Sequence, residues 1–304
     1  MLKTIAVATL SSFLFSGGGP AGCHEEQSTN WQAEKPAPPV EKEEPNSSEL
    51  KVLAEGFHSS ITNPFIAVVR DADTYAKLSK LDGNLPKLDA EFFKTNAVIA
   101  AFLGERNTGG YRVEITREVS GQIHVAEKKP GKGVMVTQMI TSPFKLVALE
   151  GSPSSTVPLS FDDTWRQRTQ SYRVNNGTFT ASGGFAGTSE TFELRGRLLV
   201  MREGKLATLA FELFSSGLRQ MRSLTDSATA VVADDGHILI ARIGVGSLVP
   251  PPNAGLQASG MFSDQGKKLV LQFAGRVSSI ADGYSGQGSI EAEFSGTGPI
   301  RNSH

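Results

Sequence analysis

The residues best suited to direct contact with a partner lie in one short stretch of the chain. Arg106 supplies a charge, Thr108 a hydroxyl group and Tyr111 an amphipathic ring. Between them, Gly109 and Gly110 permit a tight reversal that exposes backbone amides. This set offers hydrogen bonds and an aromatic anchor, so we identify it as a candidate protein-binding loop. The alternative is structural: a hairpin or bulge in which the glycines serve backbone geometry and the tyrosine covers the core.

The sequence carries no pattern that predicts catalysis or a bound cofactor. Residues 283–287, Gly-Tyr-Ser-Gly-Gln, lack the final glycine of a nucleophile elbow. No glycine run has the spacing of a phosphate-binding loop or a dinucleotide fingerprint. Asp162-Asp163 and Asp234-Asp235 are expected to be caps or turns. The histidines are scattered without ligand spacing, at His24, His58, His124, His237 and His304. We therefore expect no enzyme, no cofactor and no metal site.

The first 22 residues have the pattern of an export signal. Lys3 precedes an apolar run over residues 4–15, which is too short to cross a bilayer as a mature helix. Residues 21–23, Ala-Gly-Cys, resemble the lipobox of bacterial lipoproteins, in which the cysteine is lipidated and becomes the first residue. Pro20 departs from that pattern, because an aliphatic residue is usual there. We predict lipidation of Cys23, the only cysteine of the chain, with cleavage without lipid as the alternative.

Composition separates a tether from two folded domains. Residues 23–49 are rich in Glu, Lys, Pro and Ser and hold too little apolar material to offset ordering entropy, so we predict a disordered linker. At 304 residues the chain exceeds a single core, and a Ser- and Pro-rich linker at residues 151–159 divides it into domains at residues 50–150 and 160–304. Because 30 basic and 31 acidic residues nearly cancel without a cationic block, nucleic acid is not an expected partner.

The first domain is predicted to be α+β, with one helix and a mixed sheet. Residues 65–70, which are apolar up to Arg70, predict a buried strand, and residues 97–103, which are apolar throughout, predict a central strand. Asp71 is a candidate N-cap for a helix over residues 72–81. Alternating apolar and polar side chains with a Ser-Gly turn predict a hairpin over residues 111–128.

Several motifs of this domain together resemble one known family. They are Val-Val-Arg-Asp at residues 68–71, the segment 102–111 with its Thr-Gly-Gly-Tyr, Lys-Pro-Gly at residues 129–131, and Gln138 followed by Thr-Ser-Pro-Phe at residues 141–144. The combination is similar to the PrcB C-terminal domain family, named for an accessory lipoprotein subunit of a bacterial surface protease complex. The resemblance covers about residues 60–150 only. It implies an exported, non-catalytic accessory role and contact with a protein partner such as a peptidase.

The second domain is predicted to be all-β. Seven or eight strands alternate with a period of two, and turn residues recur at 203–204, 234–236 and 264–266. In the last strand, Ile290, Ala292 and Phe294 are expected to face inward. This regularity predicts an antiparallel meander that is closed as a barrel or folded as a sandwich. The proline run at residues 250–252 is expected to be a rigid loop.

Two functions of different classes fit these features. The first is an exported bacterial lipoprotein that is anchored in the cell envelope, faces the periplasm or the cell surface, and serves as a protein-binding accessory module, for a peptidase among other candidates. The second is a carrier-like protein that binds a small apolar ligand in the C-terminal β domain, because an eight-stranded barrel is wide enough to hold one. We expect the first.

Overall fold

The most apolar segments of the chain form a four-stranded antiparallel sheet. The computed structural model describes residues 50–151, 155–183, 188–216, 222–244, 255–276 and 285–298. The sheet has the order β1-β6-β3-β2, with β1 at Lys51–Gly56, β2 at Phe65–Val69, β3 at Asn96–Phe102 and β6 at Phe144–Glu150. β2 is buried throughout and β3 almost throughout, as their unbroken apolar sequences predict. β1 is a largely exposed edge strand.

One regular helix packs with this sheet. α1 spans Ala72–Leu81, as the sequence predicts. Asp71 is its N-cap, because its Oδ1 accepts a hydrogen bond from the backbone N–H of Thr74 at 2.8 Å. Tyr75 and Leu78 are buried against the core. A short 3-10 turn, η1 at Phe92–Lys94, leads into β3.

A second, smaller sheet completes the α+β part. β4 at Arg112–Arg117 and β5 at Ile123–Lys128 form the predicted hairpin, and β7 at Leu159–Phe161 pairs with β5 in parallel. This sheet is therefore mixed, and the predicted fold class of one helix with a mixed sheet is confirmed. α2 at Asp163–Arg166 follows and is capped by Asp162, the role predicted for that acidic pair.

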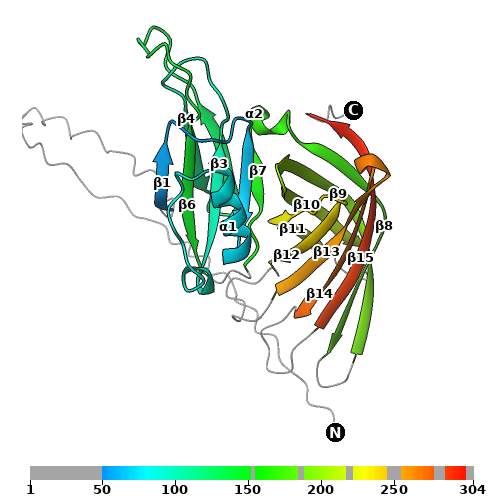
Figure 1. Ribbon diagram of the computed structural model, residues 1–304. Coiled ribbons are helices and arrows are strands. Elements are labelled where there is room, and N and C mark those ends of the chain that lie inside the picture. The colour runs from blue at the N-terminus through cyan, green and yellow to red at the C-terminus, as the bar shows by residue number, and fades with distance from the viewer. Residues whose placement is uncertain are drawn as a thin grey trace, which may run out of the picture. The chain divides into compact units, whose positions relative to one another are not determined.

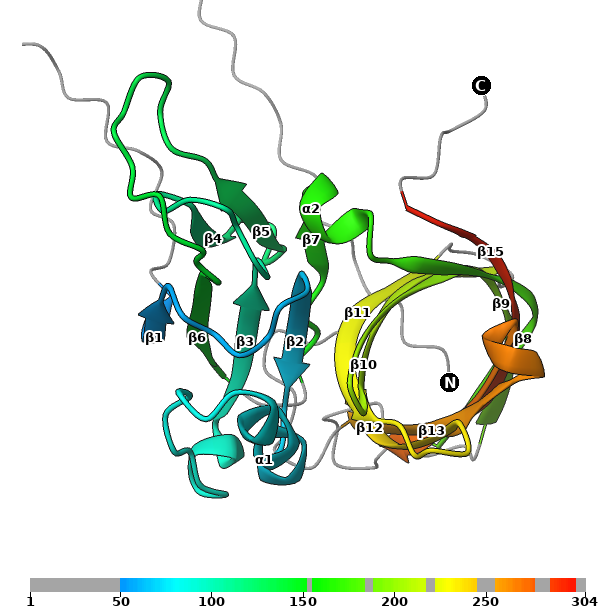
Figure 2. The same cartoon turned by 45° about the horizontal axis from the view of Figure 1, so that its top comes forward.

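The remaining strands form an eight-stranded antiparallel barrel, seen nearly along its axis in Figure 2. They follow the chain as a meander: β8 Gln170–Gly183, β9 Thr188–Glu203, β10 Leu206–Ser216, β11 Arg222–Val231, β12 His237–Ile243, β13 Gly255–Ser263, β14 Lys268–Arg276 and β15 Ser285–Thr297, with a 3-10 turn, η2, at Asp264–Gly266. β15 pairs with β8, which joins the last strand to the first (Figure 1). Tyr172, Leu198 and Phe211 are among the buried side chains of one apolar cluster inside it. Of the two predicted architectures, the barrel is the one observed.

Phe294 departs from the burial expected of the last strand. Ile290 and Ala292 are buried, whereas Phe294 is 41% exposed. Its ring still lies against Tyr172, with 5.9 Å between the ring centroids in an edge-on arrangement. Phe294 is close to the end of β15, which ends at Thr297, so the strand leaves the barrel core there.

Four of the predicted segments lie wholly or partly outside the described residues. They are the signal peptide, the linker at residues 23–49 with Cys23, the middle of the linker at residues 151–159, and the proline run at residues 250–252. No helix in the described part of the chain is both long and apolar enough to cross a membrane.

The α+β part contacts the barrel along the edge strand β2, within the compact unit Glu44–His304. The backbone N–H of Val68 donates to Thr229 Oγ1 at 2.8 Å, and Thr208 Oγ1 donates to the carbonyl of Ile66 at 2.6 Å. The two threonine hydroxyls also lie 2.8 Å apart. An edge strand exposes unpaired backbone groups, and these threonines of β10 and β11 satisfy two of them.

Arg70, the residue after β2, lies at the seam of the barrel. Within the described residues, β11 and β12 form no ladder, and the one bridge between them joins Val232, the residue after β11, to Ile238 of β12. Farther along the seam, Arg70 Nη1 donates to the carbonyl of Ser227 in β11 and to that of Arg242 in β12, both at 2.7 Å. The guanidinium therefore joins the two strands where their backbone hydrogen bonds are missing.

Asp226 completes this connection as the buried partner of Arg70. Its Oδ1 lies 2.7 Å from Arg70 Nη2, and its carboxylate also accepts the backbone N–H groups of Val157 and Gly244, each at 2.6 Å. Burial raises the pKa of the Asp226 carboxyl, and the charge of Arg70 and these hydrogen bonds oppose the rise. The pair thus joins β2, β11, the end of β12 and the segment before β7.

We expect replacement of either partner of the Arg70–Asp226 pair to destabilise the fold strongly. Arg70→Met and Asp226→Asn should each lower the free energy of unfolding by about 3–5 kcal/mol, because each leaves one buried charge without its partner. The double variant should be more stable than the sum of the two losses predicts, by about 1–3 kcal/mol. Equilibrium urea unfolding of the four proteins measures this coupling. Strictly additive losses would contradict the pairing.

The raised pKa of Asp226 predicts a pH dependence with a definite sign. The folded state binds the Asp226 proton more tightly than the unfolded state does, so protonation of Asp226 stabilises the fold. This stabilisation is fully present below the ordinary pKa of 3.8 and is lost as pH rises through the raised pKa of the folded state. The unfolding free energy of the wild type minus that of Asp226→Asn should therefore fall as pH rises from about 3.8. Urea unfolding at a series of pH values measures it, and a difference that grows with pH would reverse the assignment.

Candidate functional site

Arg106 of the candidate loop is tied into the fold. Its backbone forms a two-bond bridge with Thr141, at 2.8 and 2.9 Å. Its Nε donates to Glu127 Oε1 at 2.7 Å, and its Nη1 donates to the carbonyls of Leu103 and Glu105, both at 2.9 Å. The side chain of Arg106 is only 18% exposed and that of Glu127 only 7%. Much of the guanidinium is thus committed inside the protein.

The Arg106–Glu127 pair belongs to a polar network that reaches α2. Glu127 Oε2 accepts the hydroxyl of Thr164 at 2.7 Å, and the backbone N–H of Glu127 donates to Asp162 Oδ2 at 2.7 Å. Asp162 also caps α2 through the N–H of Thr164. The network fixes the strand end at Glu127 to the start of α2, so it positions the base of the candidate loop.

The remaining candidate residues pin a second loop, residues 129–140, to the first. The backbone N–H of Gly109 donates to the carbonyl of Thr137 at 2.8 Å, and Thr141 Oγ1 donates to the carbonyl of Thr108 at 3.1 Å. Gly110 has φ of +86°, and a Cβ there would lie 2.8 Å from Val136 and 3.0 Å from Pro130. The glycines therefore provide both a left-handed turn and room for the neighbouring loop.

Tyr111 is partly exposed and partly packed on the core, so it combines features of a contact residue and of a structural residue. Its ring is half-buried against the apolar core and lies 5.8 Å from the guanidinium carbon of Arg106. The structure thus brings Arg106 and Tyr111 into contact with each other, while Thr108, Gly109 and Gly110 face the loop at residues 129–140. All five residues lie at the end of β4 and β5 from which that loop projects (Figure 1).

The second loop carries the exposed apolar residues that the sequence reasoning did not single out. Residues 134–138 belong to this loop and do not form a strand. Side chains before and after Thr137 face solvent, with exposed fractions of 60% at Val134, 97% at Met135, 50% at Met139 and 62% at Ile140. We call these four residues the apolar loop patch. In the sequence these residues form an apolar run beside Lys-Pro-Gly, a pattern that does not by itself show whether the side chains are buried or exposed.

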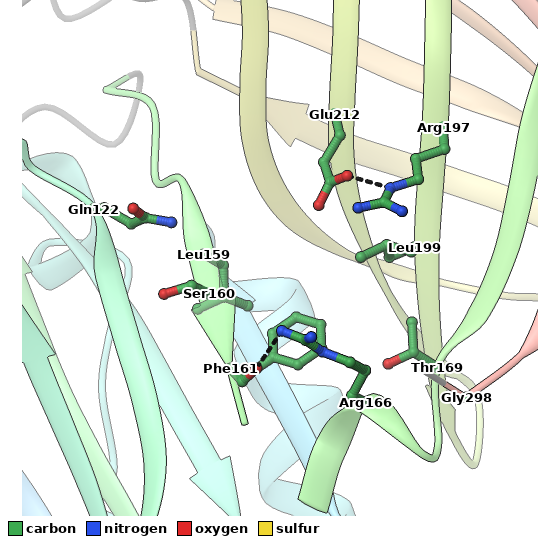
Figure 3. A pocket seen from close by; sticks show the side chains of 10 residues that line it. All are labelled: Gln122, Leu159, Ser160, Phe161, Arg166, Thr169, Arg197, Leu199, Glu212 and Gly298. Atoms are coloured by element: carbon green, nitrogen blue, oxygen red, sulfur yellow. Dashed lines mark hydrogen bonds and ion pairs between the residues drawn. The ribbon is translucent and has the colours of Figure 1, made fainter. Parts of the chain in front are cut away.

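A polar cleft of about 210 Å³ lies between β7 with α2 and the barrel strands β9 and β10 (Figure 3). Arg166 lines one wall and donates to the carbonyl of Phe161 at 3.1 Å. Arg197 lines the opposite wall and is paired with Glu212. Gln122, Ser160 and Thr169 also line the cleft. Its charged groups are already engaged with the protein, so it is a weaker candidate than the apolar loop patch.

Ser160 and His124 form the one pair in this region with the residue types of a nucleophile and a base. His124 Nδ1 lies 2.9 Å from Ser160 Oγ, and the two residues are register partners in the parallel pairing of β5 and β7. In the described part of the chain no carboxylate binds the other ring nitrogen to orient it. We interpret the contact as a cross-strand pair. Within the same residues, no three His, Cys, Asp or Glu side chains gather as a metal site.

Comparison with known proteins supports the family resemblance over part of the chain. Residues 97–150 match the PrcB C-terminal family, within the range that the motifs predicted. The matched residues include β3, the candidate loop, β4, β5, the apolar loop patch and β6. The Val-Val-Arg-Asp motif at residues 68–71 precedes the match. No curated protein matches the chain.

Among solved structures, one match is the vaccine antigen transferrin-binding protein B from Haemophilus parasuis, crystallised as a point mutant. The two chains are 13% identical, and the alignment covers 62% of this chain and 38% of that one. This chain thus spans well under half the length of that protein. The TM-score is 0.28, which is too low for the likeness to carry an argument.

The role of Gly110 in holding the second loop can be tested with a matched control. Gly110→Ala and Gly133→Ala both place a side chain at positive φ and should each cost about 1–2 kcal/mol. A Cβ at Gly110 also meets Val136 and Pro130, whereas one at Gly133 meets nothing within 4 Å. Hydrogen exchange at the Gly109 amide should therefore accelerate in Gly110→Ala and stay unchanged in Gly133→Ala. Equal exchange in both variants would show that the contact does not hold the loop.

Proposed function

We propose that this chain is an exported, lipid-anchored accessory protein of the bacterial cell envelope that has no catalytic activity and binds a protein partner through its α+β part. A peptidase is the partner that the family resemblance suggests. The observation that carries the proposal is the apolar loop patch, because its four side chains face solvent on a surface that belongs to the matched region.

Exposed aliphatic side chains on a loop need a reason. Scattered single apolar residues are ordinary on protein surfaces, but several on one loop favour an interaction site. Met135, at 97% exposure, gives up nearly all the burial that it would have in a core. Methionine is enriched in interfaces and adapts its shape to a partner. Burial against a partner would return the lost hydrophobic stabilisation.

The loop is also held in place before any partner arrives. Thr137 is bonded to Gly109, and Thr141 is bonded to Arg106 and Thr108. These anchors flank Met139 and Ile140 and follow Val134 and Met135. A loop that is already ordered loses less entropy on binding, so it presents its apolar side chains at lower cost. The candidate residues Arg106, Thr108 and Gly109 thus support the contact surface in this proposal.

Export and anchoring are proposed from the sequence pattern at residues 1–23. The apolar run, the small residues and Cys23 fit a lipoprotein signal, and residues 23–49 would give the folded part reach from the envelope. The family resemblance agrees, since its namesake is an accessory lipoprotein. Cys23→Ala should therefore move the protein from the membrane fraction to the soluble fraction of fractionated cells. A variant that still partitions with membranes would contradict the anchor.

The carrier alternative is less well supported. The inward-facing side chains of the barrel, including Tyr172, Leu198 and Phe211, are buried against one another in a single cluster. A carrier would need much of that volume for its ligand. Native mass spectrometry of the purified protein separates the two functions, because a stoichiometric lipid or other small apolar molecule would favour the carrier.

The partner-binding function can be tested by co-purification from the producing bacterium. We expect Met135→Ser with Ile140→Ser to reduce recovery of a specific partner at least about tenfold, because contacts at the centre of an interface contribute on this scale. Val119→Ser is the matched control, since Val119 is 91% exposed but lies in the turn at the other end of β4 and β5. Undiminished recovery with the double variant, or an equal loss with Val119→Ser, would contradict the proposal.

A further inference from the structure

We infer that the apolar loop patch docks into an apolar pocket that is rimmed by carboxylates on a folded protein partner. This inference rests on the proposed function and names the chemistry of the surface that the partner must present. Met135 is the side chain that enters the pocket, because it is the most exposed of the four.

The charge around the patch points to an acidic rim. Lys128, Lys129 and Lys132 precede it, and the chain contains no Asp or Glu from residue 128 to residue 149. Lys128 lies 3.4 Å from Glu114. Among the described residues, Lys129 and Lys132 are exposed and form no ion pair. Two free cations beside an apolar tip attract carboxylates and disfavour a basic partner.

An anionic membrane would also attract lysines beside apolar residues, but the residue types favour a protein. Residues 129–140 contain no aromatic side chain. Loops that rest at a membrane interface characteristically place Trp or Tyr there. Flexible methionines, of which the patch has two, are instead typical of surfaces that adapt to protein partners.

The register of β1 places the loop away from the point where the tether joins the fold. Lys51 pairs with Ala148 and Gly56 pairs with Phe144, and the loop ends just before Phe144. The chain therefore enters the sheet at the end opposite the loop, about 15 Å away along β1.

Site-specific photocrosslinking in the producing bacterium tests this inference on the full chain. A photoreactive residue at Met135 should give one discrete protein adduct, and the same residue at Val119 should give none. Lys129→Glu with Lys132→Glu should reduce the Met135 adduct at least about fivefold. Adduct formation by the wild type in solubilised extract should also fall several-fold as salt rises from about 50 to about 500 mM. In the double variant, whose glutamates would be repelled by the carboxylates of the partner, adduct formation should not fall with salt.

The outcomes separate this inference from the proposed function. If the partner co-purifies but crosslinks at Val119 and not at Met135, or if charge reversal leaves the Met135 adduct unchanged, the inference fails while the accessory function stands. If no partner co-purifies at all, the proposed function fails as well. If the wild type floats with vesicles of phosphatidylcholine and phosphatidylglycerol at about 2:1, and both Met135→Ser and the lysine reversal abolish flotation, the patch binds membrane and the inference is overturned.

Discussion

The fold depends most on the hydrogen bonds and the ion pair that the guanidinium of Arg70 forms at the seam of the barrel. A barrel built as a meander closes where its last strand meets its first. Here β15 and β8 are paired along their length at that closure, and backbone pairing is instead missing between the consecutive strands β11 and β12. Their carbonyls need donors, and Arg70 supplies them to Ser227 and Arg242 from outside the barrel. An arginine suits this position because its fixed fork can serve two carbonyls and a carboxylate together. A lysine at the same place would have a smaller, less directed set of donors.

Arg70 also helps to cover the free edge of strand β2. Strand β2 has β3 on one side only, so its other edge would be open to another chain. Two threonines of the barrel occupy that edge, and Arg70 fixes the end of the strand to the seam. The next residue, Asp71, turns the chain into α1 as its cap. Adjacent residues thus perform two separate tasks, one in the barrel and one in the α+β part.

The sequence predicts the local structure well because each element carries its own pattern. The cap at Asp71 and the alternation along the barrel strands are local signals, and both appear as expected. The seam could not be predicted, since Arg70 and Asp226 are 156 residues apart and a lone arginine after a strand has no distinguishing pattern. The apolar loop patch was missed for a related reason. An apolar run such as residues 134–140 reads as a buried strand, and its exposure depends on the tertiary fold.

The candidate loop shows how a fold marker and a contact surface can share one stretch of sequence. The glycines and Arg106 build the turn and hold the neighbouring loop through backbone hydrogen bonds and close packing, which gives each of them a structural role. The exposed apolar side chains are on the neighbouring loop, which the glycines and Arg106 hold in place. In the proposed function, recognition would depend on the Thr-Gly-Gly-Tyr segment indirectly, through the position that it gives to the neighbouring loop. On that proposal, substitutions in the segment would weaken partner binding by releasing the loop, whereas substitutions at Met135 would change the contact itself. The distinction matters because only the second kind leaves the fold unchanged.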